Sequence, residues 1–375
     1  QLGLSYLVFP GANHSRFEHA LGASYLMRQA ISVLRLKGHE ITDAEAEAVT
    51  AAILLHDIGH APFSHVLENT LVEILHEDIS LLLMNQLNNQ FNGKLYLAIQ
   101  IFTNQYKKHF LHQLVSSQLD MDRLDYLNRD SFFTGVVEGT IGVERIIKML
   151  NVWEDQLVVD EKGIYSIEKF LISRRLMYWQ VYLHKTVVSA ENLLINVLKR
   201  AKELVMAGEN VYSTPTLKVF LENNFTPADF ENNIIIEGKS ILNWYSQLDD
   251  NDISISIKEW QSHPDLVLSS LADSLNNRKL FKIQLLSSPV SKTAEEKILR
   301  KITQEITNDS SLSGYFLMSG EITNNAYDKH NEKILVLDKT GKIKDMQQAS
   351  DINLTTLTKI VRKYFLCFPK ELDIN

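Results

Sequence analysis

Residues 51–57 read Ala-Ala-Ile-Leu-Leu-His-Asp, so an apolar run ends on an imidazole and a carboxylate that are adjacent in the chain. By itself such a pair arises often by chance. Burying both groups without partners at the end of a helix would cost several kcal/mol, whereas a shared cation satisfies both. His56 and Asp57 are therefore the first candidates for a metal site.

Two further candidate ligands lie elsewhere in the chain. His19 ends the run Arg-Phe-Glu-His at 16–19, and Asp122 lies in Asp-Met-Asp-Arg-Leu-Asp-Tyr at 120–126. Each residue alone is more often a satisfied core histidine or a capping aspartate, but the four in this order favour one divalent metal per site. Two nitrogens and two oxygens suit Fe, Mn, Co, Ni or Zn better than Ca, and they do not distinguish Mn, Fe, Mg, Zn, Ni and Co. Such an ion would activate a water and neutralise phosphate charge.

A second layer of titratable residues follows within 21 positions of His56: His60, His65, His76 and Glu77. An imidazole near a metal can act as general acid toward a leaving oxygen, since its pKa lies near working pH. A neighbouring carboxylate can hold an imidazole in one tautomer. Spacing does not say which histidine has which role, and each alone could equally be a surface or capping histidine.

Candidate substrate contacts share helix faces with these ligands. Arg16 lies three residues before His19, and Arg123 adjoins Asp122, so both could reach a metal-bound polyphosphate. Tyr126 and Asp130 are four and eight residues after Asp122 and suit a sugar, although Asp130 could instead pair with charges on the helix surface. Farther along, one stripe is either a substrate wall or a polar packing face: Arg174, Tyr178, Tyr182 and Lys185.

The composition is that of an ordinary globular protein. The chain has 375 residues, 45% hydrophobic and 22% charged, with a net charge of −8 and one cysteine, Cys367. The acidic balance makes nucleic acid an unlikely partner but allows a small phosphorylated substrate. No apolar stretch could span a membrane, the first residues do not resemble a secretion signal, and an internal disulfide is impossible, so we expect a cytoplasmic protein.

Periodicity predicts a mainly α fold with a smaller α+β part at the C-terminal end. We expect helices over about 15–36, 43–56, 64–75, 77–90, 95–106, 112–129, 167–206 and 292–307. Strands are expected at 281–285 and 333–337, and a hairpin is expected between 156–160 and 162–166. The predicted division is a core at 1–207 and a C-terminal region at 208–375, with packing and oligomerisation as its role.

Three motifs together resemble one family. They are Phe-Pro-Gly-Ala-Asn-His-Ser-Arg-Phe-Glu-His-Ala-Leu-Gly at 9–22, Leu-His-Asp-Ile-Gly-His-Ala-Pro-Phe-Ser-His at 55–65, and residues 120–126 quoted above. They are similar to the HD-domain phosphohydrolases, and within these to the deoxynucleoside triphosphate triphosphohydrolase branch. The resemblance covers roughly residues 1–200 and is loose beyond, where it rests on 277–282.

The resemblance implies an all-helical catalytic core with His19, His56, Asp57 and Asp122 as metal ligands. Water would attack the α-phosphorus of a dNTP, releasing a deoxynucleoside and triphosphate. His65 would donate the proton, with His60, His76 and Glu77 around the phosphates or the water. Arg16 and Arg123 would hold phosphates, and Tyr182 and Tyr178 would lie near the base. Around the deoxyribose would lie Gln1, Leu2, Tyr126 and Asp130, with Tyr126 leaving no room for a 2′-hydroxyl.

The same resemblance implies a homo-oligomer, dimer or tetramer, and in some members an activating nucleotide at a subunit interface. Two alternatives stay open. One is an HD phosphohydrolase of another phosphoester, such as a nucleoside monophosphate or a cyclic dinucleotide. The sugar-contacting set of Gln1, Tyr126 and Asp130 favours a dNTP over these. The other is a non-catalytic nucleotide sensor or nucleic-acid-binding module, which the intact ligand set and the acidic balance disfavour.

Overall fold

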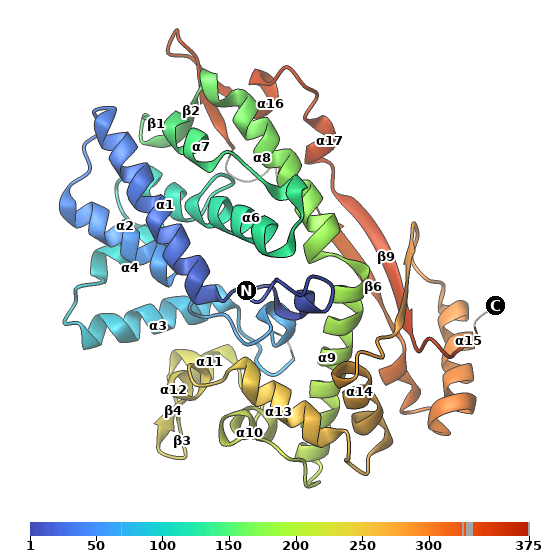
Figure 1. The fold of residues 1–375 in the computed structure, drawn as a ribbon. Coiled ribbons are helices and arrows are strands. Elements are labelled where there is room, and N and C mark those ends of the chain that lie inside the picture. Colours follow the sequence, from blue (N-terminus) through green and yellow to red (C-terminus); the bar gives the residue numbers. More distant parts are fainter. Residues whose placement is uncertain (69, 325, 328–332, 374–375) are drawn as a thin grey trace.

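A computed structural model describes residues 1–68, 70–324, 326–327 and 333–373. Helices dominate it, which confirms the predicted mainly α class with a smaller α+β part (Figure 1). The helices of the N-terminal half are α1 (Arg16–Leu36), α2 (Asp43–Leu55), α3 (His76–Gln90), α4 (Tyr96–Phe102), α5 (His109–Val115), α6 (Met121–Thr134), α7 (Val143–Met149), α8 (Ile164–Met177) and α9 (Lys185–Met206). Short 3-10 helices include η1 (Gly3–Leu7) and η2 (Ser64–Val66), and the π-helix η5 (Tyr178–Tyr182) joins α8 to α9.

The second half adds short helices and most of the strands. Its helices are α10 (Pro215–Glu222), α11 (Pro227–Glu231), α12 (Ile241–Tyr245), α13 (Asp250–Trp260), α14 (Leu266–Asn276), α15 (Lys292–Ile302), α16 (Met346–Ala349) and α17 (Thr355–Thr358). A four-stranded sheet has the order β1 (Leu150–Trp153), β2 (Gln156–Asp160), β7 (Leu335–Leu337), β8 (Ile343–Asp345). A three-stranded antiparallel sheet has the order β5 (Lys282–Leu286), β9 (Val361–Phe368), β6 (Met318–Asn324), and β3 (Ile235–Ile236) pairs with β4 (Lys239–Ser240).

The helices that carry the candidate ligands begin at strong capping residues. Ser15 and Glu18 form a capping box at α1, and Thr42 and Glu45 form another at α2. The Asp120 side chain accepts the backbone N–H of Arg123 at 2.7 Å at the start of α6. Because these caps are encoded locally, the first turns of all three helices are set by a few neighbouring residues.

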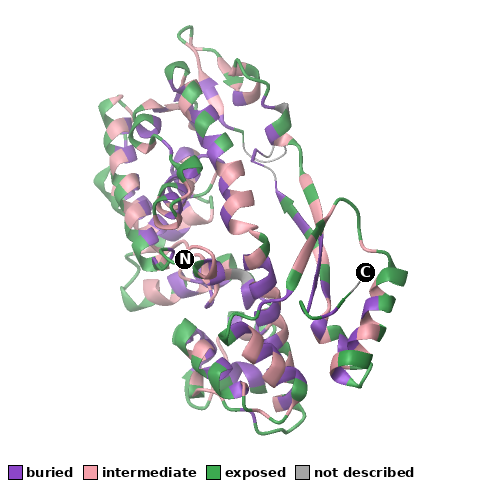
Figure 2. Cartoon of the chain, turned by 45° about the vertical axis from the view of Figure 1, so that its right-hand side comes forward, coloured by how far each residue is buried: buried purple, intermediate pink, exposed green. Residues whose placement is uncertain are grey.

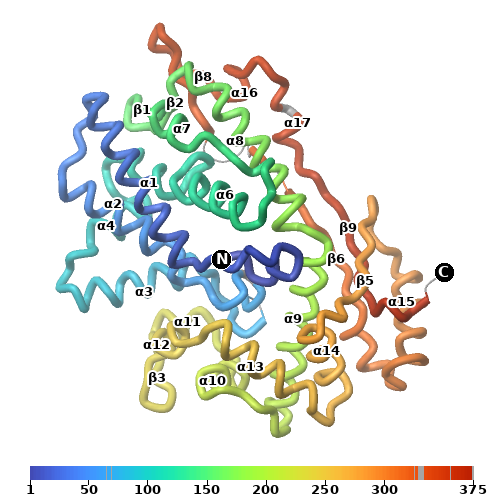
Figure 3. Tube along the Cα trace, viewed as in Figure 1, coloured from blue at the N-terminus to red at the C-terminus, as the bar shows by residue number. Residues whose placement is uncertain are grey.

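The buried side chains form two hydrophobic cores, and α9 belongs to the second. One joins α1, α2, α6 and α8 to the β1–β2 hairpin, and the other joins α9 to α10, α13 and α14 and to the β5–β9–β6 sheet. Purple, buried positions accordingly line the inner faces of these helices, whereas green, exposed positions mark their outer faces (Figure 2). Because β2 pairs in parallel with β7, the C-terminal chain also joins the first core. Figure 3 shows this return past α8.

Four predicted elements are wrong. The helix expected over 112–129 is divided into α5 and α6 by residues 116–120, since Asp120 caps a new helix. Among the described residues of 64–75, the expected helix is absent apart from η2, because Phe63 and Ser64 have φ of 55° and 60°, which do not start an α-helix. The partner of β2 is β1 rather than 162–166, since Glu154 and Asp155, at φ 46° and 63°, form the turn. The helix expected over 167–206 is interrupted by η5, which divides it into α8 and α9. None of the helices in the described ranges is long and apolar enough to cross a membrane.

Candidate functional site: a metal centre beside an arginine and tyrosine wall

The structure brings His19, His56 and Asp122 to one point. His19 lies in the first turns of α1, His56 directly follows α2, and Asp122 lies in the first turn of α6. Asp122 Oδ1 is 3.1 Å from His19 Nε2 and 3.5 Å from His56 Nε2. Their three ligand atoms lie within 4.8 Å of one another, which is the spacing that a single bound cation requires.

In both imidazoles the nitrogen that faces away from Asp122, Nδ1, is already hydrogen-bonded to another group. His19 Nδ1 is 2.8 Å from Asp125 Oδ2, and His56 Nδ1 is 2.6 Å from the carbonyl oxygen of Ile53. These acceptors place the proton on Nδ1 and leave the Nε2 lone pairs directed at Asp122. Both Nε2 atoms are buried and have no hydrogen-bond partner among the described residues. A ligand pair oriented by outer acceptors is the usual arrangement around a protein-bound metal.

The charges of the cluster also fit a cation. Burial by itself lowers the pKa of His19, but Asp122 and Asp125 raise it to about 10. Burial likewise lowers the pKa of His56, while Asp57 and Asp122 raise it to about 8. The two imidazoles in turn hold the pKa of Asp122 well below its usual range, against the effect of burial. The carboxylate charge that attracts protons to Nε2 is what a divalent cation would neutralise.

Asp57 lies at the edge of this group. Its Oδ1 is 3.4 Å from His56 Nε2, and its Oδ2 is 3.9 Å from His19 Nε2. Oδ2 also accepts a hydrogen bond from Arg16 Nη1 at 2.6 Å. Asp57 is thus placed to serve as the fourth ligand while it fixes the first predicted phosphate-binding arginine. Its role as a ligand stays a prediction.

The predicted second layer centres on a glutamate that the sequence analysis missed. Glu68 Oε1 is 2.8 Å from His76 Nδ1 and 3.9 Å from His60 Nδ1. The rings of His60 and His76 stack at 3.8 Å with an interplanar angle of 17°, and His60 Nε2 is 3.5 Å from Asp57 Oδ1. Nitrogen lone pairs lie in the ring plane, so two stacked rings point poorly at one ion between them. We therefore interpret this group as a proton-handling layer rather than a second metal site.

The pKa values of His60 and His76 are shifted in opposite directions by their surroundings. Burial, with Arg16 and His76, lowers the pKa of His60 to about 4, although Asp57 opposes the shift. Burial also lowers the pKa of His76, but Glu68, Glu77 and Asp57 raise it overall. Glu77 Oε1 is 3.4 Å from His76 Nε2 and is largely exposed. The backbone of His65 belongs to η2, and its side chain lies outside the described residues, so its role stays a prediction.

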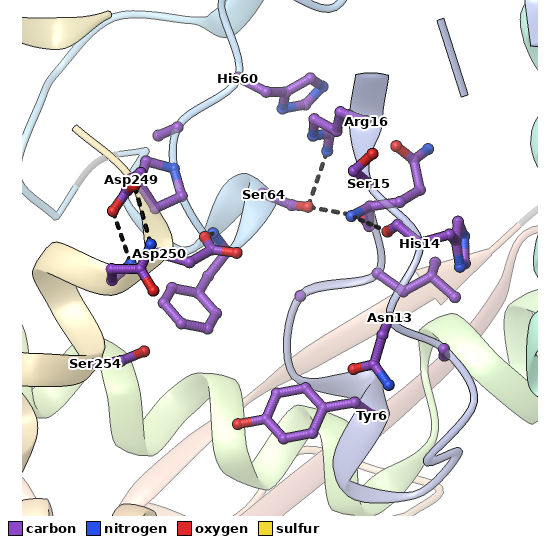
Figure 4. A pocket seen from close by; sticks show the side chains of 18 of the residues that line it. Tyr6, Asn13, His14, Ser15, Arg16, His60, Ser64, Asp249, Asp250 and Ser254 are labelled. Carbon is purple, nitrogen blue, oxygen red and sulfur yellow. Dashed lines mark hydrogen bonds between the residues drawn. The ribbon is translucent and has the colours of Figure 1, made fainter. Parts of the chain in front are cut away.

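The three candidate phosphate-binding arginines, Arg16, Arg123 and Arg174, each have identifiable partners. Arg16 donates from Nη2 to Ser64 Oγ at 2.8 Å, and Ser64 Oγ donates to the carbonyl of Gln1 at 3.1 Å (Figure 4). Arg123 forms an ion pair with buried Asp120, a partner that sequence reasoning had not assigned. Arg174, on α8, lies over the ring of Tyr178 at 6.0 Å from the ring centroid. Burial raises the pKa of Tyr126, on α6, against the opposing charges of Arg174 and Arg123. The two helices α6 and α8 therefore contribute arginines to one wall.

The predicted sugar and base residues form a connected polar group. Tyr182 donates to Asp130 Oδ2 at 2.8 Å, and His14 Nε2 is 2.7 Å from Asp130 Oδ1. Asp130 is buried and both of its oxygens are engaged, so it orients Tyr182, a bond that sequence spacing did not reveal. Tyr126 lies edge-on to Tyr182 at 6.0 Å. Lys185, the last member of the predicted stripe, follows η5 and begins α9.

A cavity of about 620 Å³ opens beside Arg16 and His60 (Figure 4). Gln1 and Leu2 line it, and Gln1 Oε1 is buried with no hydrogen-bond partner among the described residues. Asp249 and Asp250, from the start of α13, line its opposite side. The cavity is large enough for a nucleotide-sized ligand.

Comparison with known proteins agrees with the geometry. Residues 16–130 match the HD domain, and residues 141–217 match the HD associated region. A crystal structure of a phosphohydrolase from Bacteroides thetaiotaomicron is 52% identical, with a TM-score of 0.93 over 98% of this chain and 91% of that one. The uncharacterized protein YwfO of Bacillus subtilis is 33% identical over 99% of this chain and 85% of YwfO. The human deoxynucleoside triphosphate triphosphohydrolase SAMHD1 is 26% identical over 58% of this chain and 42% of SAMHD1.

A helical core that gathers His19, His56 and Asp122 beside the adjacent Asp57 is the arrangement of an HD domain, and this chain belongs to the HD-domain family. Within that family it is an HD phosphohydrolase of the SAMHD1-like branch, as the first inspection of its motifs predicted.

Proposed function

We propose that this protein is a metal-dependent deoxynucleoside triphosphate triphosphohydrolase, which converts a dNTP and water to a deoxynucleoside and triphosphate. The observation that carries the proposal is the junction of two groups. The His19, His56 and Asp122 cluster has the spacing to hold a cation, and the proposed phosphate and sugar residues Arg123 and Tyr126 follow Asp122 on α6, while Arg174 lies on α8. Cation, arginines and an aromatic ring are what a polyphosphate attached to a nucleoside requires.

The ligands proposed for one divalent cation are His19, His56, Asp57 and Asp122. When bound, it would supply an activated water and neutralise charge on the phosphate. The protein's own groups would do the rest. Arg16, Arg123 and Arg174 would orient the triphosphate, and Glu68 would hold the His76 ring in one tautomer through its 2.8 Å contact. Donation of a proton to the leaving 5′-oxygen is assigned to His65, with His60, His76 and Glu77 around the attacking water.

We assign binding of the nucleoside part of the substrate to the three tyrosines near Asp130 and to the first residues of the chain. Tyr126, edge-on to the Tyr182 ring that Asp130 orients, would pack on the deoxyribose and leave no room for a 2′-hydroxyl. Gln1 and Leu2 would close the sugar site from the cavity side, and the unpartnered Gln1 Oε1 could accept from a sugar hydroxyl. Tyr178 and Tyr182 would face the base.

The test is an assay of each dNTP with Mn or Mg that measures triphosphate release, with and without added dGTP as an activator. We expect triphosphate from at least one dNTP and none from Asp122→Ala. The His65→Ala variant should keep its metal and lose most activity, whereas wild-type rates in that variant would contradict the assigned proton donor.

Nucleoside monophosphates, cyclic dinucleotides and the matching ribonucleotides complete the substrate panel. Turnover of the first two without triphosphate release would replace the proposal with another phosphoester hydrolase. Nucleotide binding without any turnover would indicate a sensor. We further propose a homo-oligomer and, since Cys367 is the single cysteine, a cytoplasmic location.

A further inference from the structure

We propose that Lys363, on β9 of the C-terminal region, is a positioning residue for Tyr178 and Tyr182. It acts on these tyrosines of the π-helix η5 through Trp179. The position of these tyrosines can be tested without any substrate. Only the kinetic consequence rests on the proposed function.

The segment to be positioned is unusual. In η5 the amide of Leu183 donates to the carbonyl of Tyr178 at 2.7 Å, five residues back, so the turn is wider than in an α-helix. Such π-turns are rare, single and often found at functional sites. An α-helical continuation would rotate the following side chains by one position, so the π-turn sets where Tyr182 points. A conformation of this kind persists only if the surroundings support it.

Support on the inner side comes from the wall itself. The rings of Tyr178 and Tyr182 meet edge-on at 5.1 Å, and Tyr182 is bonded to Asp130. Tyr182 packs against the first core, together with Tyr126. These contacts fix one side of η5 and form part of the proposed nucleoside site.

Support on the outer side comes from the C-terminal sheet. Trp179 packs against the second core, and Lys363 Nζ lies 3.9 Å from the centroid of its ring. Lys363 is held in register opposite Ile322 between β9 and β6. A cation at this distance over an indole is a favourable contact, and it is partly shielded because Lys363 is half-buried. The π-helix is therefore held between two cores, and Lys363 is the outer contact.

The C-terminal region also contacts a second candidate substrate-binding residue, Arg174. Arg174 Nη1 donates to the carbonyl of Ala326 at 3.1 Å, and the amides of Ala326 and Tyr327 both donate to the carbonyl of Leu357. Ala326 lies just beyond β6, the strand that pairs with β9. The C-terminal sheet and its extension thus contact both the arginine and the π-helix, which gives this region a part in the site beyond packing.

The experiment compares amide hydrogen exchange of peptides covering 176–184 in wild type, Lys363→Ala, Lys363→Gln and Lys363→Arg. We expect exchange in Lys363→Ala and Lys363→Gln to be faster by about three- to tenfold, and near wild type in Lys363→Arg, which keeps the cation. The matched control is Lys282→Ala on β5 of the same sheet, because Lys282 lies over a different ring, 5.9 Å from the centroid of Phe368. Unchanged exchange in Lys363→Ala, or equal acceleration in Lys282→Ala, would overturn the proposal.

Steady-state kinetics then separate positioning from a general loss of stability. For Lys363→Ala we expect KM for the hydrolysed nucleotide to rise about three- to tenfold, with unchanged metal content and a kcat close to wild type. Equal losses in all three readouts would indicate partial unfolding and would contradict a positioning role. If the wild type releases no triphosphate from any dNTP, the proposed function fails, whereas the exchange result still decides the role of Lys363.

Discussion

The two histidines of the metal candidate are oriented by unlike acceptors. His19 relies on the carboxylate of Asp125, while His56 relies on a backbone carbonyl that any side chain at 53 would supply. A charged acceptor raises the basicity of the imidazole more than a neutral one does. Of the two histidines, His19 should therefore be the one whose affinity for the metal depends more on a single replaceable side chain, that of Asp125.

Asp122→Asn tests the ligand set itself. The amide is nearly isosteric but carries no charge, so we expect bound divalent metal and phosphohydrolase activity to be lost while the helical fold is kept. Metal analysis of the purified protein and circular dichroism measure the two effects. The control is Asp43→Asn, whose side chain is 93% exposed and pairs with Arg35 at the surface. Full metal occupancy in Asp122→Asn would rule out this ligand set.

Asp125→Asn tests the outer acceptor. Because the ligand His19 stays in place, we expect metal affinity to fall by about 10- to 100-fold rather than vanish. Competition with a chelator of known affinity measures this. Arg129→Ala is the matched control, since it removes the other partner of Asp125 at 2.8 Å and leaves the bond to His19. An equal loss in Arg129→Ala would mean that the ion pair, rather than the orientation of His19, sets the affinity.

At the scale of elements, a close contact at Gly59 fixes the turn after α2 against the start of α3. The turn that follows α2 meets the start of α3 so closely that only glycine fits at 59. A Cβ there would lie 2.1 Å from the carbonyl oxygen of His76 and 2.4 Å from the amide of Ser80. The same contact brings His60 and His76 together, so the packing of one turn on one helix end creates the second layer.

Gly59→Ala should therefore destabilise the protein by about 3 kcal/mol or more, since both clashing atoms belong to the backbone. Thermal unfolding followed by circular dichroism checks this. Gly314→Ala is the control, because a Cβ at that position has open space. A Gly59→Ala protein with the melting temperature of the wild type would show that the turn and α3 can separate freely.

The start of α2 predicts a pH dependence of stability. Burial by itself raises the pKa of Glu45, but Lys108, Tyr106 and the backbone of Thr42 lower it to about 2, against roughly 4.3 in an unfolded chain. A lowered folded-state pKa contributes stability that is complete above the unfolded pKa and is lost as pH falls through the folded one. Glu45→Gln should cost about 1–2 kcal/mol at pH 7, and its difference from wild type should shrink between about pH 5 and pH 2.

Melting temperatures measured across that range test the effect of Glu45. The control is Glu47→Gln, an exposed position on the same helix, for which we expect no pH-dependent difference. A constant gap between wild type and Glu45→Gln down to pH 2 would exclude the proposed contribution of the carboxylate.

At the scale of the whole molecule, two neighbouring helices carry apolar side chains that the described chain leaves exposed. Phe17, Leu21 and Tyr25 form one stripe of α1, with exposures of 68%, 49% and 63%. Phe132 and Val137, at 78% and 75% exposed, lie on and just after α6, which packs on α1 (Figure 1). An aromatic side chain can bury roughly 150–250 Å², so these exposed apolar side chains are candidates for a contact with another copy of the chain.

This face is where we expect copies of the chain to meet in the proposed homo-oligomer. Phe17→Ser combined with Leu21→Ser should shift the protein toward monomers, because it removes the apolar centre of the face. Light scattering after size-exclusion chromatography measures the mass. The control is Tyr96→Ser, an aromatic of 63% exposure on α4. A monomeric wild type, or a double variant with unchanged mass, would place the interface elsewhere or exclude it.

The sequence alone could predict the features that depend on residues close together in the chain. The helix starts follow from caps a few residues long, the fold class follows from periodicity, and the family follows from three contiguous motifs. The order His19, His56-Asp57, Asp122 could also be read from the chain, and the structure brings its members together. The caps and the motifs need only neighbouring residues, because a cap or a helical turn spans four positions at most, whereas the meeting of the three ligand segments needs the tertiary fold.

Only the tertiary structure decided which residues support that set. Asp125 lies 106 residues from His19, His14 lies 116 residues from Asp130, and Arg174 lies 152 residues from Ala326. No periodicity links such distant positions. Each of these contacts depends on how separate helices and the returning C-terminal strands pack, and packing is a property of the whole chain rather than of any segment.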